Sequence, residues 1–192
     1  MDKKIYLIDL DNTLIHTNRA NNLAYEKAIK DLFKGNRGEH IYSQIFRASN
    51  GRITKQDLIK NKLCLNDIDK IVIAKNDCFK YFLFATRRND NLYKKLQEIK
   101  RQEDTSITLV TNANKQRANE LLAYYETYSL FENVIYCGGI DNKYEYAINE
   151  LFPLNIYDFK IEQAHIFDDD YQQILNAKKY GFKDKNLHLI SQ

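Results

Sequence analysis

The chain has 192 residues and a mass of 22.7 kDa, which is typical of one domain that carries an insertion rather than of two full domains. Its 44% hydrophobic and 12% aromatic content excludes a wholly disordered chain, and a single Pro with only 6 Gly leaves too few turn formers for a β-sandwich or a collagenous repeat. The net charge of +3 is too small to indicate a nucleic-acid or membrane partner, and three widely spaced cysteines fit neither a disulfide framework nor a zinc site.

The first predicted element is a strand near the N-terminus. Residues 5–8 form a short apolar run with two isoleucines, which is typical of a buried strand. Asp9 ends this run far short of the length of a signal-peptide core or a membrane span. We therefore expect a cytoplasmic protein that has no membrane anchor and keeps its cysteines reduced.

A long stretch of different character follows the first strand. From about residue 16 to residue 105, apolar side chains recur at helical spacing and glycines interrupt the pattern. The spacing predicts helices throughout this stretch. The last of them, over 91–100, is assigned to the sheet domain as the connection that precedes its second strand.

The remainder of the chain alternates between apolar, β-branched runs and helical patterns. The runs predict strands at 107–110, 134–136, 165–167 and 187–190, and the helices lie at 115–127, 144–152 and 172–180. Gly181 follows the last helix as its predicted C-cap. This alternation predicts an α/β fold whose parallel sheet is flanked by helices. The predicted domains are 1–15 together with 90–192, and an inserted helical domain over 16–89.

Polar clusters follow three of the predicted strands. They are Asp9-Leu10-Asp11-Asn12-Thr13, Thr111-Asn112 and Asp168-Asp169-Asp170. Because the carboxyl ends of parallel strands lie along one edge of a sheet, these clusters should converge at a ligand site. Like charges about 4 Å apart repel by roughly 4 kcal/mol at an effective dielectric constant of 20, so the converging carboxylates need a cation. Hard oxygen ligands without His or Cys favour Mg²⁺ over zinc.

Asp9 and Asp11 are the candidate catalytic pair. In extended backbone, residues two apart project to the same side, so one carboxylate could attack a substrate while the other transfers protons. Thr13 could stabilise the turn through its hydroxyl. The alternative is that this Asp-Asn-Thr cluster forms only a turn.

The second cluster and a downstream lysine offer groups suited to an anion. Thr111 and Asn112 provide a hydroxyl, an amide and backbone N–H groups, and Lys143 provides a positive charge. Each has a simpler alternative, because Thr-Asn before a helix is commonly an N-cap and a single lysine is usually solvated. Their order along the chain, together with the acidic clusters, favours a phosphate site.

This ordered set resembles the haloacid dehalogenase (HAD) superfamily of aspartate-nucleophile phosphotransferases. The resemblance covers the first strand and most of residues 105–190. It implies that Asp9 is the nucleophile, that Asp11 is the general acid and base, and that Lys143 is the third-motif lysine. Lys143 lacks the proline that commonly follows that lysine, and Asp170 stands where the family often has a small residue.

The same resemblance implies the ligands of the site. Ile166-Phe167-Asp168-Asp169 looks like the fourth motif, in which Asp169 binds Mg²⁺ directly and Asp168 helps directly or through water. The implied metal-binding residues are Asp9, Asp11, Asp168 and Asp169. The implied phosphate-binding residues are Thr111, Asn112 and Lys143.

The resemblance also implies a Rossmann-like fold with an inserted α-helical cap, which supplies substrate specificity. The implied activity is Mg²⁺-dependent hydrolysis of a small phosphorylated metabolite through an aspartyl-phosphate. The motif style is similar to that of soluble pyrimidine 5'-nucleotidases, so a nucleoside monophosphate is the first substrate expected, ahead of sugar phosphates. In the cap, His16, Arg87 and Arg88 could bind an anionic part of the substrate or could lie on a solvated surface. The alternative functions are a phosphomutase of the same fold and a non-catalytic protein that binds a partner through the cap.

Overall fold

The computed structural model describes residues 4–151 and 160–191, and the chain divides into two compact units. One unit comprises Met1–His16 with Arg88–Gln192, and the other comprises Thr17–Arg87. In the first unit the strands are β1 (Lys4–Ile8), β4 (Thr105–Thr111), β5 (Asn133–Tyr136), β6 (His165–Asp168) and β7 (Leu187–Leu189). Its helices are α5 (Asp90–Lys100), α6 (Lys115–Tyr124), α7 (Lys143–Leu151) and α8 (Tyr171–Tyr180), with 3₁₀ turns η2 (Tyr128–Leu130), η4 (Ile161–Gln163) and η5 (Asp184–Asn186).

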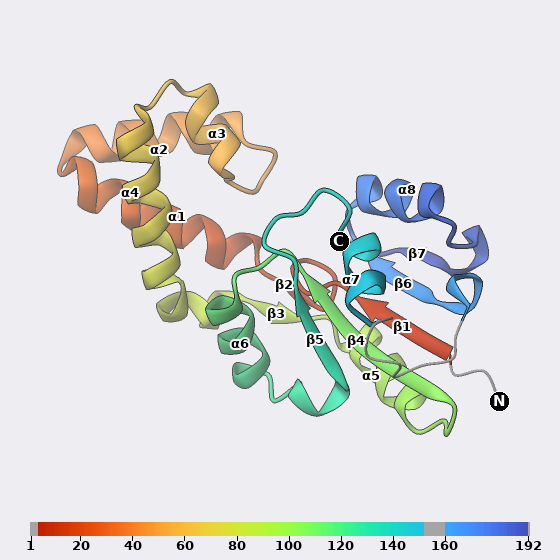
Figure 1. Ribbon diagram of the computed structural model, residues 1–192. Coiled ribbons are helices and arrows are strands. Elements are labelled where there is room, and N and C mark those ends of the chain that lie inside the picture. Colours follow the sequence, from red (N-terminus) through yellow and green to blue (C-terminus); the bar gives the residue numbers. More distant parts are fainter. Residues whose placement is uncertain (1–3, 152–159, 192) are drawn as a thin grey trace. The chain divides into compact units, whose positions relative to one another are not determined.

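The five strands form one parallel sheet in the order β5-β4-β1-β6-β7, as Figure 1 shows. From the central β1 the chain adds β4 and β5 on one side and then returns to add β6 and β7 on the other. The change of direction therefore falls between β1 and β6, where Ile8 lies beside Phe167. In open parallel sheets the crevice at such a point, outside the carboxyl ends of the strands, is where ligands bind. The predicted α/β class with a Rossmann-like parallel sheet is confirmed.

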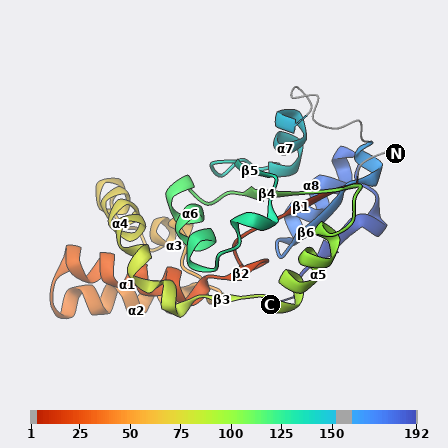
Figure 2. The ribbon, with the colours of Figure 1, turned by 90° about the horizontal axis from the view of Figure 1, so that it is seen from below.

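Burial on both faces explains why these runs became parallel strands. All seven residues of β4 are buried, which is the pattern of a strand covered by helices on both sides. On one face Ile5 and Leu7 of β1 pack in a core with Tyr144 and Ile148 of α7. Helix α5 lies on the opposite face, as Figure 2 shows, and buries Leu92, Leu96 and Ile99.

Side-chain and glycine caps set the helix ends in this unit. Asn89, Asn114 and Asp170 each accept a backbone hydrogen bond in the first turn of α5, α6 and α8. Gly181 ends α8 with φ 119°, as the sequence predicts, because its left-handed backbone favours a residue without Cβ. Helix α7 begins at Lys143, and residue 152, the last of the predicted helix, lies outside the described residues.

The second unit is helical and has a core of its own. It contains α1 (Asn18–Phe33), α2 (Asn36–Ala48), α3 (Lys55–Lys60), α4 (Leu65–Cys78) and the 3₁₀ helix η1 (Phe79–Ala85). Their buried faces meet around Tyr25, Ile29 and Ile45. Gly38 allows α2 to approach α1 closely, because a Cβ there would lie 2.9 Å from the Cα of Lys30. No helix among the described residues is both long and apolar enough to cross a membrane.

The prediction of helices throughout residues 16–105 is wrong at both ends of the helical unit. Strands β2 (Ile15–His16) and β3 (Arg87–Arg88) pair there as a two-stranded sheet. Two residues are too few to show an alternating pattern, and the pairing joins segments that are about 70 residues apart. Only the tertiary structure could reveal it.

Candidate active site

The loop after β1 makes a tight turn that places Asp9 at the carboxyl edge of the sheet. The Asp9 N–H donates to the Phe167 carbonyl at 3.0 Å, so Asp9 continues the pairing of β1 with β6. Asn12 takes φ 62°, a left-handed conformation that Asn tolerates better than most residues, and its N–H donates to the Ile15 carbonyl at 2.7 Å. The side chain of Asp9 is consequently buried and held at the end of a strand.

Thr13 joins this loop to the loop after β6. Its hydroxyl accepts from the Asp169 N–H at 2.9 Å and donates to Asp169 Oδ1 at 3.2 Å. Thr13 is fully buried, so water does not compete for these bonds. The Thr13 hydroxyl thus orients an acidic side chain from a distant segment.

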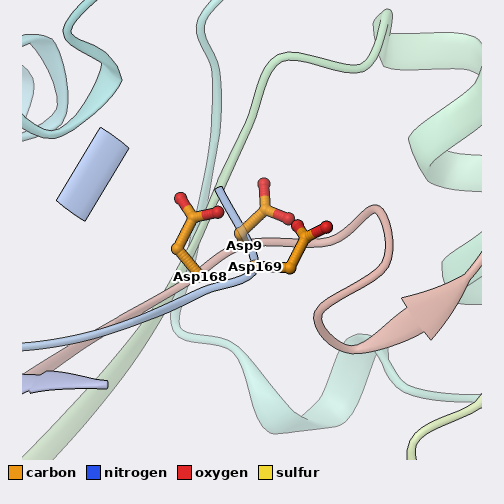
Figure 3. Close-up of side chains that lie close together, drawn as sticks. All are labelled: Asp9, Asp168 and Asp169. Carbon is orange, nitrogen blue, oxygen red and sulfur yellow. The ribbon is translucent and has the colours of Figure 1, made fainter. Parts of the chain in front are cut away.

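Three carboxylates come together at this edge of the sheet. Asp9, Asp168 and Asp169 each offer an oxygen, and these oxygens all lie within 4.8 Å of one another. Figure 3 shows the three side chains side by side. Asp168 is fully buried, and its Oδ1 accepts from the Asp170 N–H at 2.9 Å, while its Oδ2 accepts from the Tyr144 hydroxyl at 2.7 Å. Each bond uses a separate oxygen, so the Asp168 carboxylate is held in one orientation.

Lys143 lies between two of these carboxylates. Its Nζ is 2.5 Å from Asp9 Oδ1 and 2.9 Å from Asp168 Oδ2, and its side chain is only 4% exposed. Burial by itself would lower the pKa of Lys143, but the adjacent Asp9 and Asp168 more than offset this effect and raise it. The ammonium group therefore stays charged, and the first residue of α7 brings a permanent cation into the acidic cluster.

The ionisation of Asp9 depends on this cation. The pKa of Asp9 is raised to about 7, chiefly by burial; the positive charge of Lys143 opposes this rise and the negative charge of Asp168 adds to it. Lys143 thus favours the carboxylate form that a nucleophile requires.

The carboxylate of Asp11 is not part of the three-carboxylate group. It accepts a hydrogen bond from the guanidinium of Arg117, a buried residue in the first turn of α6. Sequence analysis missed Arg117, because an arginine 106 residues away in a polar helix gives no signal of a partner. Asp9 thus pairs with Lys143, whereas Asp11 pairs with Arg117.

Thr111 and Asn112 lie at the same carboxyl edge, at the end of β4. Thr111 is fully buried and its hydroxyl accepts from the Ala113 N–H at 3.0 Å, whereas Asn112 is exposed. The N-cap of α6 is Asn114, whose side chain accepts from the Arg117 N–H at 2.8 Å. The alternative of a Thr-Asn helix cap is therefore wrong, because the helix starts three residues later.

No family model and no curated protein matches this chain, but solved structures do. A haloacid dehalogenase-like family hydrolase from Streptococcus pneumoniae superposes with a TM-score of 0.69 at 16% identity, over 94% of this chain and 82% of that one. CbbY from Rhodobacter sphaeroides in complex with phosphate gives 0.68 at 17%, over 94% and 84%. YfnB from Bacillus subtilis bound to magnesium gives 0.66 at 15%, over 95% and 87%. The chain has the HAD-like hydrolase fold.

Two further residues support the site, of which sequence analysis missed Tyr144 and named Asp170 without a structural role. Tyr144 contacts Asp168, and Asp170 caps α8 by accepting from the Gln172 N–H at 2.8 Å. Asp170 thus acts at a helix start, for which an acidic residue directly before a helical run was an available signal. Tyr144 is the first residue of the helix predicted over 144–152, and its residue type gave no signal of a contact with Asp168.

The predicted anion-binding residues His16, Arg87 and Arg88 differ in their exposure and in their contacts. Arg88 pairs with Asp90 at 2.8 Å and lies over the Tyr93 ring at 3.9 Å, while Arg87 is exposed and His16 is half-buried. The contacts of Arg88 are those of a local ion pair and a cation–π contact.

The charges of the HAD-like site fit a divalent cation. Four carboxylates face two cationic side chains, which leaves two negative charges when all are ionised: Asp9, Asp11, Asp168 and Asp169 against Lys143 and Arg117. The donors are hard oxygens, and each carboxylate has more lone pairs than the bonds described above occupy. Asp9, Asp168 and Asp169 are the residues that could hold the ion.

Proposed function

We propose that the chain is a Mg²⁺-dependent phosphomonoester hydrolase that acts through an aspartyl-phosphate on Asp9. The observation that carries this proposal is the position of Lys143, whose buried ammonium lies against Asp9 at the edge where three acidic side chains meet. A buried cation beside a strand-end carboxylate both favours the ionised form of that carboxylate and offers positive charge to an incoming phosphate.

The proposed reaction has two steps, and Asp9 and Asp11 act in both. In the first, Asp9 attacks phosphorus, the ester P–O bond breaks, and Asp11 protonates the departing oxygen. In the second, water attacks phosphorus, the bond between phosphorus and the Asp9 oxygen breaks, and Asp11 takes the proton of water. Inorganic phosphate leaves and Asp9 is regenerated.

Charge on the transferring group is stabilised at the same edge. The proposed donors are Lys143, the Thr111 hydroxyl and the Asn112 backbone N–H. Thr111 ends β4, Asn112 follows it, and Lys143 begins α7. Mg²⁺ bound by Asp9, Asp168 and Asp169 would neutralise part of the phosphoryl charge.

Two solved structures with the same fold support the choice of ligand. CbbY was solved with phosphate and YfnB with magnesium. Both ligands agree with the charges of this site, a cation for the carboxylates and an anion for Lys143. We therefore propose a small phosphorylated substrate.

The finer proposal is a nucleoside monophosphate. The helical unit has a pocket of about 390 Å³ that includes Tyr42 and Phe46, whose rings stack at 5.8 Å between centroids. Asn18, Arg19 and Asn22 contribute polar groups to the same pocket. Such a combination suits a base, which has a π face and a polar edge. We expect Phe46→Ala to weaken the binding of a nucleoside to this pocket several-fold, as measured by calorimetry.

The test is phosphate release from a panel of nucleotides and sugar phosphates, with Mg²⁺ or with EDTA. Wild-type protein should release phosphate only with the metal, and Asp9→Asn should lower the rate at least about a thousandfold without unfolding the chain. Asp104→Asn makes the same chemical change at an exposed position in the same unit and should be fully active.

Other outcomes would replace the proposal. An active Asp9→Asn protein excludes Asp9 as the nucleophile. An isomerised product without free phosphate indicates a phosphomutase. A folded protein that binds Mg²⁺ but converts nothing in the panel favours a non-catalytic binding role.

A further inference from the structure

Arg117 makes a largely buried ion pair with Asp11, a residue of the proposed catalytic machinery. Its guanidinium donates to Asp11 Oδ2, and the exposed fractions of the two side chains are only 10% for Arg117 and 13% for Asp11. Arginine is rarely buried unless it is paired, because desolvation of its charge must be offset. The burial of this pair therefore calls for a role that an exposed ion pair would not fill.

The backbone of Arg117 is fixed as firmly as its side chain. The Asn114 side chain caps α6 by accepting from the Arg117 N–H at 2.8 Å, and α6 follows the short loop after Thr111, the last residue of β4. The first turn of α6 thus links the proposed phosphate-binding residues at the end of β4 to the Asp11 carboxylate. Because the backbone of Arg117 is held by this cap, its planar guanidinium restricts rotation about both side-chain bonds of the aspartate that it binds.

We propose that Arg117 is a positioning residue that holds the Asp11 carboxylate for the second step, in which water cleaves the aspartyl-phosphate. This inference rests on the proposed function. Asp11 must accept the proton of the attacking water, and a general base works only at a defined distance from that proton. The Asp11 carboxylate is not gathered with Asp9, Asp168 and Asp169, so Arg117 gives it a separate anchor.

The experiment compares Arg117→Ala with wild-type protein in turnover of p-nitrophenyl phosphate, with intact-protein mass spectrometry to measure phosphorylated enzyme. Arg117→Ala should lower kcat by about a hundredfold, change KM less than about threefold, and accumulate protein that carries one phosphoryl group. Arg117→Lys should retain part of kcat. The control Arg101→Ala removes an exposed arginine from the same unit and should behave as wild type.

Two further measurements separate positioning from structural support. Asp11→Asn and the double variant with Arg117→Ala should have nearly the same kcat, because the two residues act as one unit. Millimolar guanidinium should restore turnover and discharge the phosphorylated enzyme in Arg117→Ala, and it should do neither in Asp11→Asn. If Arg117→Ala unfolds, Arg117→Gln replaces it in the same assays.

The contrary results are distinct. Wild-type kcat in folded Arg117→Ala or Arg117→Gln overturns the role of Arg117. The role is also overturned if kcat falls without accumulation of phosphorylated enzyme and the double variant shows the sum of the two single effects. Wild-type protein that neither turns over the probe nor becomes phosphorylated overturns the proposed function, and the role of Arg117 with it.

Discussion

At the residue scale, the contacts of the site depend on which charged side chains are buried together. Lys143 has two carboxylates within 2.9 Å, and Tyr144, the next residue in the chain, donates to one of them. These consecutive residues at the start of α7 therefore act on Asp9 and Asp168 from one helix end. Each can be removed by a substitution that keeps most of its volume.

Lys143→Met should destabilise the protein by about 3–5 kcal/mol, because it leaves the carboxylates of Asp9 and Asp168 buried without their cation. Urea unfolding with and without Mg²⁺ measures this effect, and Mg²⁺ should stabilise the variant more than wild type. Lys94→Met, on an exposed position of α5, is the control. Equal unfolding midpoints for Lys143→Met and Lys94→Met would contradict the prediction.

Tyr144→Phe keeps the buried ring and removes only the hydroxyl that donates to Asp168 Oδ2 at 2.7 Å. Burial, with the negative charge of Asp168, raises the pKa of this hydroxyl, so it remains a donor. We expect a loss of about 1–3 kcal/mol in stability and roughly tenfold weaker Mg²⁺ binding by calorimetry. Tyr124→Phe at an exposed position should change neither quantity. Unaltered Mg²⁺ affinity in Tyr144→Phe would show that the hydroxyl does not orient a metal ligand.

At the element scale, strands β1, β6 and β7 are joined by stacked rings as well as by backbone pairing. Tyr6 stacks on His165 at 4.8 Å, and His188 stacks on Phe167 at 4.3 Å. The two histidines also face each other, with His165 Nδ1 3.3 Å from His188 Nε2. Two imidazoles so close together cannot both be charged without repulsion.

The stability of this sheet should therefore fall in mild acid. Burial, together with the charges of His188, Lys4 and Lys95, lowers the pKa of His165 from 6.5 to about 4. Between pH 6.5 and 4 the unfolded chain binds more protons than the folded one, so the contribution of His165 is complete above pH 6.5 and is lost as the pH falls towards 4. We expect a loss of about 1–2 kcal/mol after allowance for solvent screening.

Urea midpoints measured from pH 7 to pH 4.5 test this prediction. His165→Asn should flatten the pH dependence in this range relative to wild type. His40→Asn, at an exposed position of α2, should leave the pH dependence as it is. Parallel curves for wild type and His165→Asn would exclude a contribution from the stacked pair.

At the scale of the whole molecule, the two compact units have separate cores. The helical unit packs around Tyr25, Ile29 and Leu58, and the sheet unit packs around β1 and α7. The three carboxylates and Lys143 all belong to the sheet unit. A defect in one core should therefore loosen that unit first.

Ile29→Ala should destabilise the helical unit by about 2–5 kcal/mol, since it leaves a cavity at a fully buried position. Hydrogen exchange should accelerate across residues 17–87, while amides of β1 and β4 keep their protection. Ile148→Ala, in the core of the sheet unit, should give the opposite distribution. Faster exchange throughout the chain in both variants would mean that the units unfold together.

Much of the sheet unit was predictable because its signals are local. All five strands were placed within two residues of their observed ends, since each is a short apolar run and the central strands β1 and β4 are buried almost throughout. The three-carboxylate group was also foreseeable from strand ends, because parallel strands bring their carboxyl ends to one edge. The assignment of roles to these residues remains a proposal.

The tertiary structure decided the features that depend on long-range partners. The pairing of β2 with β3, the Arg117 contact with Asp11 and the Tyr144 contact with Asp168 join residues from 24 to more than 100 positions apart. Their residue types are common, and none carries a local pattern.

The amino-acid sequence alone thus determined the α/β class, the order along the chain of the five strands of the parallel sheet, and the edge where the acidic residues meet, because apolar periodicity and strand ends are local features of the sequence. Which cation faces which carboxylate was decided only by the folded chain. The physical reason is that an unpaired charge raises the free energy of the folded state only where packing has removed it from water. The pairing of these charges therefore depends on the tertiary structure.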